Sequence, residues 1–156
     1  MKLEEIMVKD VATIGPDDDV FAAAQRMLER SVGSLIVETD GVLKGIITDR
    51  DLLHCIGNRH DPSRCRVSAH MSRPVVTEHP DEDLLVTAEV MMRRGIKRLP
   101  VTRDGRIVGI VSFSDISRAT HELAKTFWST GVAVATLVRA VALYKSRQKE
   151  ITLEKR

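Results

Sequence analysis

Aromatic side chains are scarce, since Phe, Trp and Tyr together make up 3% of the 156-residue chain. A buried core must therefore be built from aliphatic residues and methionine, which are plentiful because 43% of the chain is apolar. An excess of one charge sign is also missing: 24 basic residues face 22 acidic ones, and the formal net charge is +2. This balance makes nucleic acid an improbable partner, because nucleic-acid binders usually carry a strongly basic face.

Only two cysteines are present, too few for the disulfide framework that holds small secreted proteins together. The first ten residues, MKLEEIMVKD, have acids where a signal peptide needs an apolar run, so we expect a cytoplasmic protein. The longest apolar stretch, residues 127–143, contains Arg139 and falls short of the about 20 apolar residues of a membrane span. We therefore expect no membrane partner.

The chain contains one unit written twice. When the sequence is shifted by 64 residues, residues 7–53 align with residues 71–117 without a gap, and 16 of the 47 positions are identical. Two copies are too few for a solenoid, which needs three or more repeats. We divide the chain into a first repeat (1–60), a second repeat (61–120) and a C-terminal extension (121–156).

Each copy has the same pattern of expected elements. A short extended run (11–14 or 75–77) leads through Pro and Asp to an amphipathic helix. Acids at 17–19 or 81–83 stabilise the first turn of this helix. A β-hairpin follows, because Asp-Gly lies between two apolar runs, and a second helix begins after it. The pattern predicts an α+β fold of two β-α-β-β-α units. The apolar face of the first helix in each unit is expected to contain Val20, Ala24, Met27 and Leu28, or Leu84, Ala88, Met91 and Met92.

The most informative repeated phrase is GIITDRD at 45–51, which returns as GIVSFSD at 109–115. Thr48 with Asp51, and Ser112 with Asp115, have the spacing of a helix capping box. The same groups also suit a nucleotide, because a helix N-terminus binds phosphate and a carboxylate accepts ribose hydroxyls. The glycine ahead of each pair would let backbone or ligand approach closely. The phrase alone leaves both interpretations open.

The repeated β-α-β-β-α pattern, the G-h-h-[ST]-x-x-D phrase, the V-x-T-x-x-P lead-in and GIKRLPV at 95–101 together resemble the tandem CBS (cystathionine β-synthase-type) domain pair, or Bateman module. The resemblance covers residues 7–117. It implies that the two repeats pair through their sheets into a disc with two pseudo-symmetric clefts, in which adenosine compounds such as AMP, ADP, ATP or S-adenosylmethionine bind.

The resemblance also assigns residues to the two clefts. Asp51 and Asp115 match ribose-binding acids of the family, Thr48 and Ser112 match its phosphate-facing hydroxyls, and a threonine of the partner repeat completes each cleft. The main cleft would then gather Thr48, Asp51 and Thr77, and the second cleft would gather Thr13, Ser112 and Asp115.

The two clefts differ in the expected cations. Lys97 and Arg98 of the second repeat match basic residues that reach nucleotide phosphates in the family, whereas the first repeat has Gly33 and Ser34 at these positions. Arg50, beside Asp51, adds a third cation to the main cleft. Each charge-assisted contact to phosphate is worth about 1.5–3 kcal/mol, so we expect the second cleft to bind weakly.

Other site types are not expected. His54, Cys55, His60, Cys65 and His70 invite a zinc site, but structural sites usually pair cysteines two to four residues apart and the five-residue spacing from Cys55 to His70 does not fit, so we predict no metal. No nucleophile–base–orienter pattern is present, so we predict no catalytic residue, no enzyme activity and no required cofactor.

The C-terminal extension lies beyond the resemblance. Apolar residues at helical spacing from His121 to about Lys149 predict a helix, which Gly131 would weaken. The CBS family commonly forms dimers, so we expect a homodimer with the helix around Trp128 as a candidate interface.

The sequence therefore favours a regulatory module that binds an adenosine nucleotide as its regulatory ligand and signals occupancy to an unknown partner protein. One alternative is a structural or interaction protein in which both boxes only cap helices. A second alternative, a nucleic-acid-binding regulator, is disfavoured by the charge balance.

Overall fold

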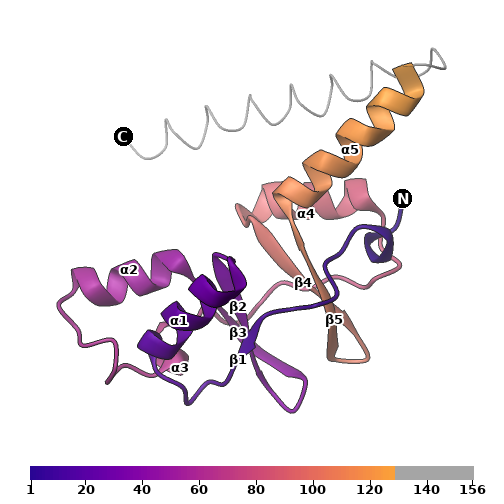
Figure 1. Ribbon diagram of the computed structural model, residues 1–156. Helices are drawn as coiled ribbons and strands as arrows, with labels where there is room; N and C mark the ends of the chain where they lie inside the picture. Colours follow the sequence, from indigo (N-terminus) through magenta and orange to yellow (C-terminus); the bar gives the residue numbers. More distant parts are fainter. Residues whose placement is uncertain (129–156) are drawn as a thin grey trace.

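The computed structural model describes the backbone of residues 1–128 and the side chains of residues 1–125 (Figure 1). Within this part, no helix combines the length and the apolar character that a membrane span requires. The fold is α+β, as predicted. In chain order the elements are η1 (Leu3–Glu5), β1 (Thr13–Ile14), α1 (Val20–Arg30), β2 (Ser34–Thr39), β3 (Val42–Thr48), α2 (Asp49–Gly57), α3 (Val67–His70), α4 (Leu84–Arg94), β4 (Arg98–Arg103), β5 (Arg106–Ser112) and α5 (Phe113–Trp128).

The two predicted hairpins are present, and Asp-Gly forms the turn of each. Asp40 and Gly41 have φ of 53° and 80°, and Asp104 and Gly105 have φ of 52° and 75°. Two consecutive positive φ angles are typical of the type I′ turn, which matches the twist of the flanking strands. The four strands flank the two Asp-Gly turns, as predicted.

The two hairpins join into one sheet with the order β1-β2-β3-β5-β4. The contact between β3 and β5 is narrow, because only Val42 and Arg106 pair across it. The lead-in strand of the first repeat is shorter than expected and pairs in parallel with β2. Its counterpart in the second repeat is reduced to one parallel bridge between Glu78 and Val101.

The first helix of each repeat starts at the predicted acid. Asp19 accepts a hydrogen bond from the backbone N–H of Ala22 (2.7 Å), and Asp83 accepts one from Leu85 (2.8 Å). Both acids satisfy backbone donors that the helix leaves open in its first turn. Each helix ends at a residue in the left-handed conformation.

The buried face of α1 and α4 differs from the predicted one. Leu28, which we placed on the core face, is 80% exposed. Successive residues of a helix are about 100° apart, so a face centred on i, i+3 and i+7 turns the next residue outward. The fully buried positions of the two helices are Val20, Ala23 and Met27, and Leu84, Thr87 and Met91.

Two short helices, which the sequence analysis did not predict, exchange between the repeats. η1 lies at the start of the first repeat, yet its Leu3 is buried in the core of the second. α3 lies at the start of the second repeat, yet its Val67 is buried in the core of the first. Leu3 and Val67 are 64 residues apart, so the repeat register extends further toward the N-terminus than our alignment.

The segments that follow these helices also cross over. Val8 and Ile110 exchange backbone hydrogen bonds of 2.9 and 3.0 Å, and Ser72 and Ile46 exchange bonds of 2.9 and 3.2 Å. Each of these segments therefore pairs with the hairpin of the other repeat. These exchanged contacts hold the two repeats together, since direct pairing of β3 with β5 is short.

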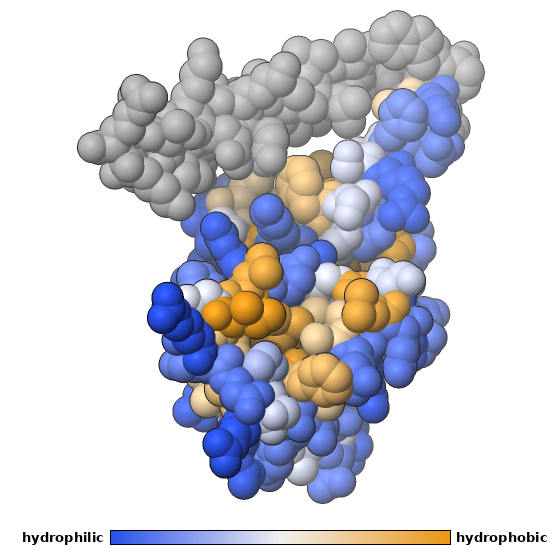
Figure 2. All heavy atoms as spheres, turned by 60° about the vertical axis from the view of Figure 1, so that its left-hand side comes forward, coloured by the Kyte–Doolittle hydropathy of each residue, from blue (hydrophilic) through white to orange (hydrophobic). Residues whose placement is uncertain are grey.

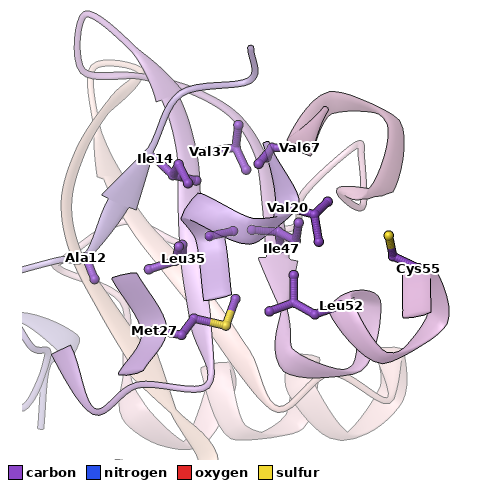
Figure 3. Close-up of a cluster of buried hydrophobic side chains, with 11 residues drawn as sticks. Ala12, Ile14, Val20, Met27, Leu35, Val37, Ile47, Leu52, Cys55 and Val67 are labelled. Carbon is purple, nitrogen blue, oxygen red and sulfur yellow. The ribbon is translucent and has the colours of Figure 1, made fainter. Parts of the chain in front are cut away.

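The core of the first repeat is aliphatic, as the scarcity of aromatic residues requires (Figure 3). Side chains from β1, β2, β3, α1 and α2 meet in it, and Val67 of α3 joins them. Cys55, at the edge of the cluster in this view, is fully buried.

The last described helix is longer than expected. We predicted one helix from Ser112 and a separate one from His121, but α5 runs without a break from Phe113 to Trp128. Residues 129–156, which include Gly131 and most of the predicted C-terminal helix, lie outside the described residues, as does the side chain of Trp128.

Candidate functional site

The repeated phrase forms the N-terminus of α2 in the first repeat. Asp51 Oδ2 accepts hydrogen bonds from the backbone N–H of Thr48 (2.7 Å) and from its hydroxyl (2.8 Å). This is the acidic half of a capping box. The other carboxylate oxygen, Oδ1, has no hydrogen-bond partner within residues 1–125, so Asp51 can cap the helix and still accept from a ligand.

The same phrase in the second repeat has a further partner. Asp115 Oδ2 accepts from the backbone N–H of Ser112 (2.9 Å) and from its hydroxyl (2.5 Å). Asp115 Oδ1 accepts a hydrogen bond from the guanidinium of Arg118 (2.9 Å). Both oxygens are therefore engaged. His54 occupies the position equivalent to Arg118 in the first repeat, so this difference was visible in the sequence, but we did not weigh it.

The glycine of each phrase accommodates a side chain of the other repeat. A Cβ on Gly45 would lie 2.5 Å from Met71 Sδ, and one on Gly109 would lie 2.6 Å from Met7 Sδ. We expected a close approach by backbone or ligand at these glycines. The backbone does approach at Gly45, where the carbonyl of Ser72 would lie 3.1 Å from a Cβ, but the nearest atoms at both glycines belong to the two methionines that begin the aligned repeats.

Arg98 is the predicted cation that the structure brings to the first repeat. A Cβ on Gly33 would lie 2.9 Å from Arg98 Nη2 and 3.0 Å from Asp49 Oδ2. Asp49 is the first residue of α2, and its N–H donates to the carbonyl of Gly33 (3.1 Å). The guanidinium of the second repeat therefore lies beside the helix start that carries Asp51.

The other two predicted cations, Arg50 and Lys97, are exposed. Neither they nor Arg98 form an ion pair with any acid in the described part of the chain. The carbonyl of Lys97 accepts from the N–H of Phe113 (2.9 Å), so its backbone lies beside the start of α5.

The two predicted threonines lie on the lead-in segments. Thr13 belongs to β1 and pairs with Ile36 of β2. Thr77 precedes Glu78, which bonds to Pro100 and Thr102 of β4, the strand that begins at Arg98. Burial raises the pKa of the Glu78 carboxyl, and repulsion from Glu82 adds to the rise.

A hollow of about 550 Å³ opens beside the N-terminus of α2. Its wall is mainly apolar and comes from α1, the segment after it and the beginning of α2. Apolar walls with a few polar groups at one end are typical of small-molecule sites. The lining residues include Met27, Leu28, Val32, Gly33, Asp49 and Leu52.

Several known proteins resemble this chain in sequence and in fold. The CBS domain protein YhcV of Bacillus subtilis is 32% identical over 115 residues, which are 74% of this chain and 82% of YhcV. The CBS domain pair of protein MJ0100, solved in complex with 5′-methylthioadenosine and S-adenosyl-L-methionine, superposes with a TM-score of 0.72 at 28% identity. That comparison covers 78% of this chain and 97% of MJ0100's domain pair.

A second structural relative is hypoxic response protein I, solved with two coordinated zinc ions. It superposes with a TM-score of 0.69 at 28% identity, and the comparison covers 76% of this chain and 98% of that one. The family model of the CBS domain matches this chain twice, at residues 3–58 and 67–122. The chain therefore belongs to the CBS domain family and carries the domain as a tandem pair.

Proposed function

We propose that this CBS pair binds an adenosine nucleotide in the main cleft and signals its occupancy to a partner protein. Asp51 accepts the ribose hydroxyls through its open oxygen, and Thr48 and Thr77 line the cleft. Arg50, Lys97 and Arg98 provide positive charge for the phosphates. The single observation that carries the proposal is Arg98, whose guanidinium reaches from the second repeat to the helix start of Asp51.

The chemistry of the region supports this assignment. The N-terminus of α2 is electropositive because of its open N–H groups, and a nearby unpaired guanidinium strengthens its attraction for phosphate. The apolar hollow next to Asp49 offers a surface for the adenine ring. The related domain pair of MJ0100 was solved with two adenosine compounds, which supports the same ligand class here.

The second cleft, formed by Thr13, Ser112 and Asp115, is proposed to bind weakly. The positions equivalent to Lys97 and Arg98 carry no charge there. Asp115 is already paired with Arg118, so a ribose would have to displace that contact. A ligand without phosphate would be less affected by this difference.

A thermal-shift panel of AMP, ADP, ATP, NADH and S-adenosylmethionine tests the proposal. A ligand at 100 times its dissociation constant should stabilise the chain by about 2.7 kcal/mol. Replacing Lys97 and Arg98 by Ala should lower the affinity for AMP by at least about tenfold, because charged hydrogen bonds to phosphate are lost. Arg94→Ala, which removes an exposed arginine at the end of α4, is the matched control.

Failure of every adenosine compound to stabilise the chain would favour the alternative of an interaction protein whose boxes only cap helices. Equal AMP affinity in the double variant and in Arg94→Ala would contradict the assigned role of the two cations. We propose no catalytic activity and a cytoplasmic location. A ligand changes the signal to the partner only by its different affinity for two states of the pair.

We also propose a homodimer. Large apolar side chains are exposed on the helices of the first repeat: Leu28 is 80% exposed, Leu53 67% and Ile56 59%. Figure 2 views the molecule from the side of α1 and α2 and shows apolar residues gathered on that face. An exposed apolar patch of this kind is typical of a protein–protein contact.

A further inference from the structure

Four metal-binding side chains meet at one point in the first repeat. The ligand atoms of Cys55, His60, Cys65 and His70 all lie within 4.8 Å of one another. Our argument against a metal rested on their regular five-residue spacing. The structure shows why that argument fails: α2, the loop after it and α3 fold back on each other, so the spacing need not follow the usual pairs.

We propose that Cys55, His60, Cys65 and His70 form a structural zinc site. Two thiolates and two imidazoles are a ligand set that Zn²⁺ binds tetrahedrally. Bond lengths of about 2.3 Å to sulfur and 2.0–2.1 Å to nitrogen place tetrahedral ligand atoms about 3.3–3.8 Å apart. The four atoms therefore need to close by only about 1 Å around the ion.

The backbone already holds the four residues in place. The N–H of His60 donates to the carbonyl of Cys55 (3.1 Å), and the carbonyl of Cys65 accepts from the N–H of Val20 at the start of α1 (2.9 Å). His70 ends α3, and its ring meets that of His60 edge to face at 6.0 Å. The ligands thus come from separate elements that the fold itself brings together.

The burial of the site fits a structural role. Cys55 is fully buried, Cys65 and His70 are half-buried, and only His60 is exposed. Four protein ligands leave no open position for a substrate, which is typical of structural rather than catalytic zinc. The ion would join the end of α2 to α3 at the edge of the first core.

The ligand set is not a product of the duplication. The positions 64 residues away from the four ligands are Ala119, Ala124, Met1 and Ile6, and none of these side chains has a zinc-binding nitrogen or thiolate. The backbone hydrogen bond between Cys65 and Val20 does have its counterpart between Met1 and Leu84. The fold is shared by both repeats, and the ligands were placed on it only once.

Metal binding by the full chain tests the proposal without any nucleotide, so its outcome is independent of the proposed function. The untagged chain is reduced, freed of metal and titrated with Co²⁺ and then Zn²⁺. We expect one ion per chain, intense visible absorption of tetrahedral Co²⁺ with thiolate charge-transfer bands, and displacement of Co²⁺ by Zn²⁺.

Two variants and two controls test whether the ion binds at this cluster. His60→Ala and Cys65→Ser should each lower the affinity for zinc by more than about a hundredfold, since the loss of even a residue that only supports a metal ligand lowers metal affinity by about 10–100-fold. His60 is exposed, so its replacement should leave the fold intact. His54→Ala and His79→Ala, both outside the cluster, should bind zinc as the parent chain does.

A reduced chain without tetrahedral Co²⁺ absorption would overturn the proposal, and so would equal zinc affinity in His60→Ala and His54→Ala. Air oxidation of the metal-free chain gives a further check. If Cys55 and Cys65 pair as a disulfide and the re-reduced chain binds no zinc, the cluster is a thiol pair and not a metal site.

Discussion

At the scale of single residues, one carboxylate can serve both interpretations of the repeated phrase. Asp51 uses Oδ2 to cap α2 and leaves Oδ1 open, whereas Asp115 has both oxygens engaged. Helix capping and ligand binding are thus not exclusive alternatives at Asp51. The repeat gives two identical acids, and their neighbours make them unequal.

The glycines of the phrase yield a stability prediction. Gly45→Ala should destabilise the chain by about 1–3 kcal/mol, because its Cβ would overlap Met71 and approach the carbonyl of Ser72 at 3.1 Å. Gly57→Ala is the control, since a Cβ there meets nothing within 4 Å and alanine favours the helix. Urea unfolding measures both; equal stability of the two variants would contradict the contact with Met71.

At the scale of elements, the starts of α1 and α4 were predictable because an acid before an apolar helix has a local cause. The hairpins were predictable for the same reason, since Asp-Gly accepts the positive φ angles of the turn. The buried face of α1 was predicted only in part: Leu28 is exposed and Ala23 is buried instead. Which side of the helix is buried depends on where the sheet packs against it, and this is tertiary information.

Elements that depend on distant segments were not predictable. η1 and α3 are three and four residues long, and each is stabilised by packing on the other repeat. The proposed zinc ligands belong to the same class, because only the fold-back of α2 and α3 brings Cys55 close to His70. The family resemblance, and not a local pattern, assigned Arg98 to the cleft of Asp51, and the guanidinium lies beside Gly33 near the start of α2.

The cap of α4 gives a prediction about pH. The N–H of Leu85 holds the pKa of the Asp83 carboxyl below its ordinary value of 3.8, and the N-terminal ammonium adds to this. A lowered pKa in the folded state stabilises the fold above the ordinary value, and this stability is lost as the pH falls below it.

Asp83→Asn keeps an N-cap acceptor but removes the titration. We expect the melting temperature of the parent chain to fall more steeply than that of Asp83→Asn between about pH 5 and about pH 3. Asp61→Asn should act in the same direction, since the hydrogen bonds of Ser63 also hold the pKa of the Asp61 carboxyl below 3.8. The same dependence of melting temperature on pH in the parent chain and in Asp83→Asn would contradict the role of the carboxylate.

At the scale of the whole molecule, the exposed apolar face predicts the oligomeric state. Leu53→Glu should turn the proposed dimer into a monomer, because a charge at the proposed contact would be costly to desolvate. Val86→Glu, an exposed position on α4 of the second repeat, is the control. Size exclusion with light scattering measures both, and a dimeric Leu53→Glu would remove this face from the interface.

The pair as a whole is nearly symmetric in backbone and asymmetric in charge. The two short helices and the segments after them cross over and bind each repeat to the other, so a ligand held by groups of both repeats can report on their relative position. The cations and the open carboxylate oxygen favour one cleft. We therefore predict a single tight nucleotide site per chain.

Calorimetric titration of AMP into the full chain, Asp51→Asn and Asp115→Asn tests this asymmetry most directly. Asn keeps an oxygen that can cap the helix but loses the charge that strengthens bonds to ribose hydroxyls. We predict one tight site in the parent, binding weakened at least about tenfold in Asp51→Asn, and affinity within about twofold of the parent in Asp115→Asn. Unchanged affinity in Asp51→Asn, with its melting temperature intact, would contradict the account.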